Sequence, residues 1–220
     1  MKLNTFKVVS KTEDTYGTGI LDNVNLSDQY CGLFRCPLAE AYKLLPDLSD
    51  LFNDANGMLI NEGHNPYEWE MDLKIHMLMK DQYPCIPNWH CDNVPRVEGK
   101  TKYNAIKEDT PPMYLWLSGN PTIEFLSTGW NCKNITPKSH DVLAKIIESQ
   151  RCNGLMVKSA PAQTWISMDQ QTPHRGTQAQ ENTWRVFVRL THNSITPVRP
   201  VNNYIRRHCQ VYLNPETFSW

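Results

Sequence analysis

The sequence lacks any run of about eighteen apolar residues, the length that a helix needs to cross a bilayer. Its first residues, Met1 to Phe6, also lack the apolar segment of a secretory signal. Charge of one sign is not in excess, because 22 lysines and arginines stand against 23 aspartates and glutamates. We therefore expect a cytoplasmic protein with no membrane partner. The balanced charge gives no support for a nucleic-acid partner, although it leaves that class open.

Cysteine pairs at metal-binding spacing are absent as well. The seven cysteines are an odd number, and none of them forms a Cys-x-x-Cys pair. This argues against both a zinc-ribbon site and a disulfide framework, so reduced and mostly buried thiols are expected. Fifteen prolines and ten glycines interrupt short apolar runs, a pattern that favours strands and loops over long helices.

The length of 220 residues predicts one domain spanning residues 1–220, with a core from about 70 to 215 and an N-terminal segment packing on it. Helices are expected from Pro37 to Leu45, between two prolines, and from Ser139 to Arg151, where Ser139 can cap the first turn. Short strands account for the rest. They are predicted at Met71–Met77, Met113–Ser118, Thr122–Leu126, Leu155–Ser159, Thr164–Met168, Thr183–Thr191 and His208–Leu213. The expected fold is mainly β with a few helices, arranged as a jelly roll or a small barrel.

Two segments far apart in the sequence offer metal ligands. The first is Asn88-Trp89-His90-Cys91-Asp92, where alternation along a strand would send His90 and Asp92 to one face. The second is the turn before His174, framed by a proline and a glycine. Two histidines and one carboxylate are the ligand set of non-haem Fe(II) oxygenases. A histidine hydrogen-bonded to a neighbouring aspartate at the end of a strand is the alternative for the first segment.

Two arginines follow on one face of the strand Thr183–Thr191. Arg185 and Arg189 alternate with Val186, Val188 and Leu190, which form an apolar face. A guanidinium inside or at the rim of a barrel is costly unless it has an anionic partner, and a carboxylate held by two hydrogen bonds is a natural one. An ion pair at the rim is the alternative role for either arginine.

In this order, His90-x-Asp92, then His174, then Arg185 and Arg189 resemble the Fe(II)/2-oxoglutarate-dependent dioxygenases. The Trp-His-x-Asp form and the arginine pair are most similar to the taurine dioxygenase-like branch, over about residues 85–191. The resemblance implies a double-stranded β-helix, a jelly roll of cupin-like form. It also implies Fe(II) held by His90, Asp92 and His174, with 2-oxoglutarate as cosubstrate and O2 as oxidant. Arg189, with Arg185, would pair with the distal carboxylate, and the sequence leaves open which of the two is the main anchor.

Other residues are candidates for lining the site. Tyr114 and Trp116 share a face of their predicted strand and could contact the cofactor, although ordinary aromatic packing is the alternative. Asn88 and Arg96 flank the metal triplet and are candidate substrate contacts, with a solvated loop position as the alternative for each.

The implied activity is hydroxylation of an unactivated C–H bond, with release of succinate and CO2. The small size and balanced charge favour a small molecule as substrate, such as an amino acid or another metabolite. A nucleobase, nucleic-acid or protein hydroxylase of the same family stays open, and so does the oligomeric state. Two further alternatives are a metal-binding jelly roll without oxygen chemistry and a structural module that needs no metal.

Overall fold

The computed structural model describes residues 1–12, 19–29, 32–119, 122–132, 135–195 and 203–213. Within these residues the chain folds mainly into antiparallel strands, with a few helices. The α-helices are α1 (Leu38–Leu44), α2 (Ser49–Asn61) and α3 (His140–Arg151). Short 3-10 helices are η1 (Leu26–Asp28), η2 (Pro46–Leu48), η3 (Pro66–Glu68) and η4 (Tyr103–Ala105).

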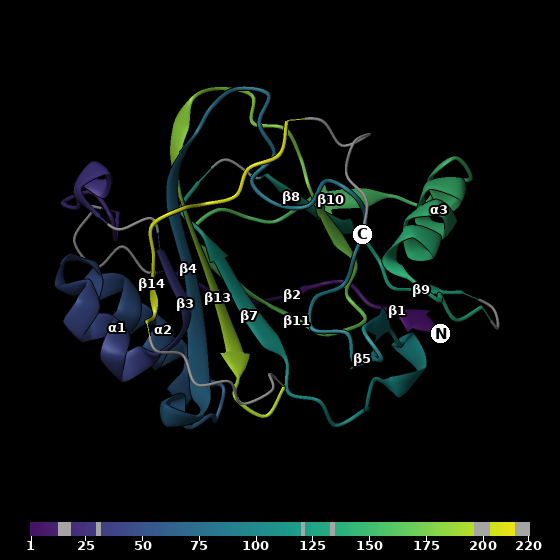
Figure 1. The fold of residues 1–220 in the computed structure, drawn as a ribbon, viewed down its shortest axis with the longest axis horizontal. Helices are drawn as coiled ribbons and strands as arrows, with labels where there is room; N and C mark the ends of the chain where they lie inside the picture. Colours follow the sequence, from purple (N-terminus) through teal and green to yellow (C-terminus); the bar gives the residue numbers. More distant parts are fainter. Residues whose placement is uncertain (13–18, 30–31, 120–121, 133–134, 196–202, 214–220) are drawn as a thin grey trace.

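A large antiparallel sheet dominates the described part of the chain (Figure 1). Its order is β14-β3-β4-β13-β7-β11-β2. The bounds are β2 (Lys7–Lys11), β3 (Gly32–Pro37), β4 (Trp69–Leu78), β7 (Met113–Leu117), β11 (Thr164–Met168), β13 (Thr183–His192) and β14 (Ile205–Arg206). The N-terminal region therefore contributes strands β2 and β3 to the same sheet as the later segments.

A smaller sheet faces the large one. Its order is β10-β8-β12, with bounds β8 (Ile123–Leu126), β10 (Val157–Ser159) and β12 (His174–Gly176). Two short strand pairs lie apart from both sheets: β1 (Lys2–Leu3) with β9 (Trp130–Asn131), and β5 (Arg96–Val97) with β6 (Lys100–Thr101).

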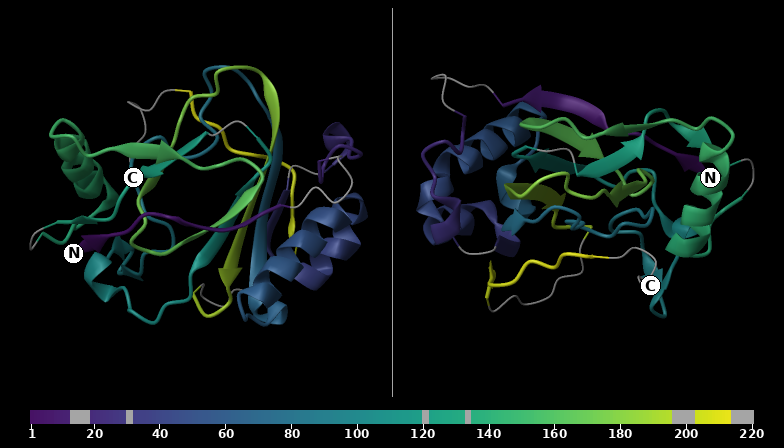
Figure 2. Two further views of the ribbon diagram at one scale, coloured as in Figure 1. Left: turned by 180° about the vertical axis from the view of Figure 1, so that it is seen from behind. Right: turned by 90° about the horizontal axis from the view of Figure 1, so that it is seen from above.

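The helices cover the outer sides of the two sheets, which gives a layered molecule with α1 and α2 at one end and α3 at the other (Figure 2). Leu51, Phe52 and Leu59 of α2 pack with buried residues of β4 and β13. Leu143 and Ile147 of α3 pack in a separate cluster that includes Leu126 of β8. A third cluster lies between the sheets and contains Leu115, Ile123, Phe125, Ile166 and Met168.

Strands β4 and β13 are neighbours in the middle of the large sheet, and each has one mostly apolar face and one polar face. They pair over ten residues, from Thr183 opposite Leu78 to His192 opposite Trp69. The odd positions of β4 and the even positions of β13 are mostly apolar and pack against the helices. Asp72 and His76 of β4 lie opposite Arg189 and Arg185 of β13. These polar residues therefore share the face that looks toward the small sheet.

The predicted fold class is confirmed: the protein is mainly β with a few helices, and two facing antiparallel sheets give a jelly-roll arrangement. The described strands do not close into a single barrel. Both predicted helices are present as α1 and α3, and the Ser139 hydroxyl accepts a 3.2 Å hydrogen bond from the backbone N–H of Val142 as expected of a cap.

Other local predictions were wrong. Residues 208–213 form no strand, and their regular pairing is limited to an isolated bridge between Tyr212 and Tyr83. Trp184, which lies on the same face of its strand as the buried Val186, Val188 and Leu190, has 38% of its surface exposed. Helix α2 and strands β2 and β3 were not predicted.

Two findings bear on the expectations from composition. The six cysteines that the structure describes are all free thiols, three of them buried, and Cys31 lies outside the described residues. Among the helices of the described residues, none combines the length and the apolar character that crossing a bilayer requires.

Candidate metal centre

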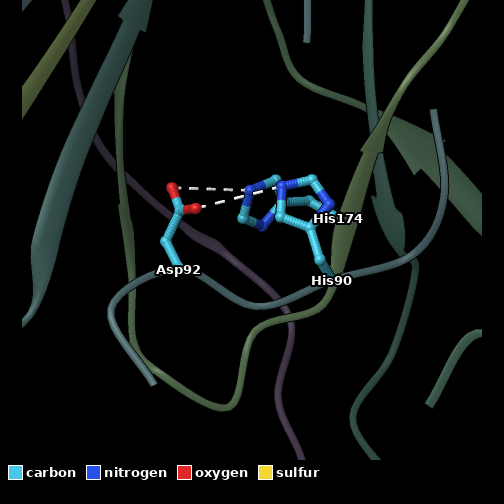
Figure 3. Close-up of side chains that lie close together, drawn as sticks. All are labelled: His90, Asp92 and His174. Carbon is cyan, nitrogen blue, oxygen red and sulfur yellow. Dashed lines mark ion pairs between the residues drawn. The ribbon is translucent and has the colours of Figure 1, made fainter. Parts of the chain in front are cut away.

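His90, Asp92 and His174 converge between the two sheets (Figure 3). The backbones of His90 and His174 pair through two N–H to carbonyl hydrogen bonds of 3.0 and 2.9 Å, which brings their ring centroids to 4.4 Å. Nε2 of His90 lies 3.9 Å from Oδ1 of Asp92, and Nε2 of His174 lies 3.6 Å from its Oδ2. One ligand atom from each residue lies within 4.8 Å of the others, so the group could hold a metal ion.

The sequence predicted that these three residues converge, but it did not predict the backbone conformation of the segment that carries His90 and Asp92. His90 takes part in an isolated bridge, and Asp92 lies in a turn instead of a strand. Trp89 and Cys91 do point away, into the apolar cluster beside α3, so the alternation of directions holds. The turn continues at Asn93, whose φ of 53° is in the left-handed region, and it directs the Asp92 carboxylate back toward the imidazoles.

Hydrogen bonds at the far side of each imidazole set its tautomer. Nδ1 of His90 lies 2.8 Å from the carbonyl oxygen of Asn88, and Nδ1 of His174 lies 3.1 Å from that of Thr172. A carbonyl only accepts, so each Nδ1 carries a proton, and Nε2 is the ring nitrogen that each histidine turns toward Asp92. Burial, together with His174, lowers the pKa of His90 to about 3, so this ring is neutral and suited to bind a metal.

Arg189 is tied to the chain's own carboxylates. Its Nη1 donates to Asp92, and its Nε and Nη2 donate to Oδ2 of Asp72 at 3.2 and 2.6 Å. Burial alone would raise the pKa of Asp92, but the charge of Arg189 outweighs it and holds that pKa well below its usual range. The guanidinium of Arg189 thus holds the candidate metal ligand Asp92, and a role for Arg189 as the anchor of the distal carboxylate stays a prediction.

Arg185 has the surroundings that were predicted for an anchor. It is 2% exposed, and its Nε donates a 3.0 Å hydrogen bond to the hydroxyl of Thr122. Its Nη1 and Nη2 are buried and have no hydrogen-bond partner among the described residues. Burial lowers the pKa of Arg185 to about 10, which still leaves it cationic at neutral pH. A buried cation of this kind needs an anion.

One cavity of about 210 Å³ joins Arg185 to the three candidate ligands. Leu115, Ile123 and Met168 form part of its apolar wall, and Lys74 adds a second positive charge. A larger cavity of about 900 Å³ lies beside α2 and includes none of the candidate ligands. Asp54, at the wall of the larger cavity, already accepts hydrogen bonds from Trp165 and Thr12. The smaller cavity is therefore the one lined by both the candidate metal ligands and the cations Arg185 and Lys74.

Tyr114 and Trp116 lie on the other face of the large sheet. The Tyr114 hydroxyl is 2.8 Å from Nε2 of His64, and Nε1 of Trp116 donates to the Thr12 hydroxyl at 2.8 Å. Both belong to the apolar cluster around α1 and α2. The prediction that they line the cofactor site was wrong, because the inward face of β7 carries Leu115 and its neighbours at odd positions.

The two candidate substrate residues differ in their relation to the centre. Asn88 contacts it through its backbone carbonyl, which accepts from His90. Arg96 is exposed on the short β5–β6 hairpin, and its charge helps to lower the pKa of the buried His140, second to burial. A substrate contact by either side chain stays a prediction.

Helix α3 braces both ligand segments from behind. Trp89 and Arg175, each next to a candidate ligand, donate hydrogen bonds of 2.7 and 2.9 Å to the same Glu148 oxygen. The Arg175 guanidinium also lies 5.0 Å from the Trp89 ring and pairs with Glu124 of β8. The segments that carry His90 and His174 are thus tied together by contacts on the side opposite the imidazoles.

Sequence reasoning missed Asp72, Thr122, Lys74 and His76. Three of these lie on β4, which was predicted as a strand from Met71 to Met77, but its polar side chains were not assigned to the site. That face instead meets the arginines of β13 under the small sheet. The sequence could have indicated these residues only if the polar face of β4 had been paired with Arg185 and Arg189. That pairing depends on the register between the two strands, which the sequence alone does not give.

The comparisons with known proteins assign no family. No family model matches the chain, and no curated protein matches it. Among solved structures, it is similar to AviO1 from Streptomyces viridochromogenes Tue57, with a TM-score of 0.49 and 12% identity, over 90% of this chain and 94% of that chain. Similarity at this level carries neither an activity nor a ligand over to this protein.

Proposed function

We propose that this protein is an Fe(II)- and 2-oxoglutarate-dependent dioxygenase that hydroxylates an unactivated C–H bond of a small molecule. The observation that carries the proposal is the joint position of two features in one cavity. A group of two histidines and one carboxylate lies at one part of its wall, and the unpartnered guanidinium of Arg185 lies at another. The first suits non-haem Fe(II), and the second needs an anion.

The donor set fits the metal. A neutral imidazole from His90 and an ionised carboxylate from Asp92 require no proton to be displaced near pH 7, as the directions of their pKa shifts indicate. The carbonyls of Asn88 and Thr172 fix both rings, and Arg189 holds Asp92. Three protein ligands leave other coordination positions for a cosubstrate.

The cavity also fits a diacid. Arg185 would pair with the distal carboxylate of 2-oxoglutarate, and Thr122 orients the guanidinium for that contact. Leu115, Ile123 and Met168 would keep water away from the bound cosubstrate. When bound, Fe(II) and 2-oxoglutarate supply the oxidising chemistry, in which O2 is consumed, succinate and CO2 are released and a C–H bond is hydroxylated.

The proposal is tested by adding Fe(II) and 2-oxoglutarate to the protein without oxygen. We expect a visible charge-transfer absorption band, and succinate should form once air is admitted. His174→Ala should abolish both signals because it removes a metal ligand. His208→Ala is the matched control, since His208 is exposed and outside the cavity.

A wild-type protein that gives neither band nor succinate would overturn the proposal. Metal binding without any response to 2-oxoglutarate would favour a metal-binding jelly roll without oxygen chemistry.

A further inference from the structure

Unsatisfied polar atoms are concentrated at one place in the described part of the chain. Six buried side-chain nitrogen or oxygen atoms there have no hydrogen-bond partner, and four of the six belong to His76 and Arg185. These four are both ring nitrogens of His76 and the two terminal nitrogens of Arg185. Buried polar groups are nearly always paired, so two neighbouring residues with this defect indicate a missing polar ligand.

His76 lies directly across from Arg185 in the sheet. The two are register partners on β4 and β13, so their side chains leave the sheet on the same inward face. His76 is 8% exposed. Lys74 lies two residues before His76 on β4. Its ammonium is 5.5 Å from the centre of the Phe187 ring, and the Arg185 guanidinium is 5.2 Å from the centre of the same ring. Lys74, Arg185 and Phe187 line this end of the cavity, and His76, which is not itself a lining residue, lies beside Arg185 as its register partner.

Burial and the neighbouring charges keep the His76 ring neutral. Burial, together with Arg185 and Lys74, lowers the pKa of His76 to about 4. A neutral imidazole has one N–H to donate. Beside two cations, the partner that accepts from this N–H and also compensates Arg185 is an anion with several acceptor oxygens. A carboxylate has this chemistry.

We infer that His76 is a binding residue for the distal carboxylate of the cosubstrate, to which it donates a hydrogen bond beside the guanidinium of Arg185. The inference rests on the proposed function and extends it to a residue of β4. It makes His76 a determinant of selectivity for a five-carbon 2-oxo diacid over a 2-oxo acid that ends in a methyl group.

The test compares two ligands that differ only at the distal end, 2-oxoglutarate and 2-oxopentanoate. Their affinities for the zinc-loaded protein are measured by calorimetry. His76→Leu should weaken 2-oxoglutarate binding about ten- to hundredfold, as expected for losing one hydrogen bond to a charged group, and should leave 2-oxopentanoate within about twofold. His76→Gln keeps an N–H donor and should retain most of the affinity. Met77→Leu, on the other face of β4, is the matched control.

A second measurement uses the wild-type protein and does not depend on the folding of His76→Leu. The ring resonances of His76, assigned by their absence in His76→Gln, should shift when 2-oxoglutarate is added and stay in place with 2-oxopentanoate. Equal weakening of both ligands by His76→Leu, or no weakening of either, would overturn the inference alone. A wild-type protein that binds metal but no 2-oxoglutarate would overturn the proposed function itself.

Discussion

Arg185 and Arg189 are four residues apart on one face of one strand, yet the structure gives them different surroundings. Arg189 meets Asp72 across the sheet and Asp92 beside it, so its charge is compensated within the chain. Arg185 meets His76, and its terminal nitrogens have no partner among the described residues. The neighbour on β4 therefore decides which arginine is available to a ligand.

Substituting the two arginines separates these roles. Arg185→Leu should leave metal affinity unchanged and weaken 2-oxoglutarate binding at least about 30-fold, because a buried charge pair is lost. Calorimetric titration with metal and then with 2-oxoglutarate measures both quantities.

Arg189→Leu should instead lower the free energy of unfolding by roughly 2–4 kcal/mol, since Asp72 and Asp92 lose their shared cation while remaining partly exposed. Added metal should restore part of that stability because it pairs with Asp92. Urea denaturation with and without metal checks this. The assignment of roles would be wrong if the two variants behaved alike in both assays.

The sequence predicted the three candidate metal ligands and the two-faced pattern of β13, because residue type and alternation are local properties. It could not predict which arginine is free, since that depends on the register with β4. It also placed His90 and Asp92 in a strand, whereas a turn after His90 brings the carboxylate inward. Helix α2 was missed although Leu51, Phe52, Ala55, Met58 and Leu59 form an apolar stripe at helical spacing.

At the scale of elements, the close approach of β12 to the segment before the metal triplet is a constraint on the site. Gly176 of β12 donates from its backbone N–H to the carbonyl of Ile86 at 2.8 Å. A Cβ atom at Gly176 would lie 2.6 Å from the carbonyl oxygen of Cys85, which is closer than real contacts allow. The absence of a side chain there lets His174 approach His90.

Gly176→Ala should therefore destabilise the protein by about 1–3 kcal/mol and weaken metal binding, because β12 must move away from Cys85. Gly57→Ala in α2 is the control, since its added Cβ meets nothing within 4 Å and should stabilise the helix by about 0.5–1 kcal/mol. Urea denaturation and metal titration of both variants measure the effects. Unchanged metal affinity in Gly176→Ala would contradict the proposed constraint.

At the scale of the whole molecule, the layered fold buries histidines in a neutral state. Burial is the largest cause that lowers the pKa of His76 and of His140, each to about 4 from 6.5. An unfolded chain takes up protons on these rings as the pH falls below about 6.5, whereas the folded protein does not until near pH 4. Folding stability is therefore greatest above pH 6.5 and is lost as the pH falls from there toward 4.

We expect the free energy of unfolding of the metal-free protein to decrease steadily between pH 6.5 and 4. His76→Gln should show a smaller decrease over the same window because it removes one of the groups that titrate only when unfolded. Urea denaturation at several pH values, followed by tryptophan fluorescence, provides the measurement. Stability that is constant or rises on acidification across this window would be inconsistent with neutral, buried histidines.

The Glu148 contacts have a consequence for how such a centre can be adjusted. One carboxylate on α3 accepts hydrogen bonds from residues next to both candidate histidine ligands, so the position of this helix bears on the separation of the two imidazoles. Substitutions along α3 that shift this carboxylate by a fraction of an ångström would retune the coordination sphere while every ligand is kept. Residues of α3 could thus tune the candidate metal centre from outside the cavity that it faces.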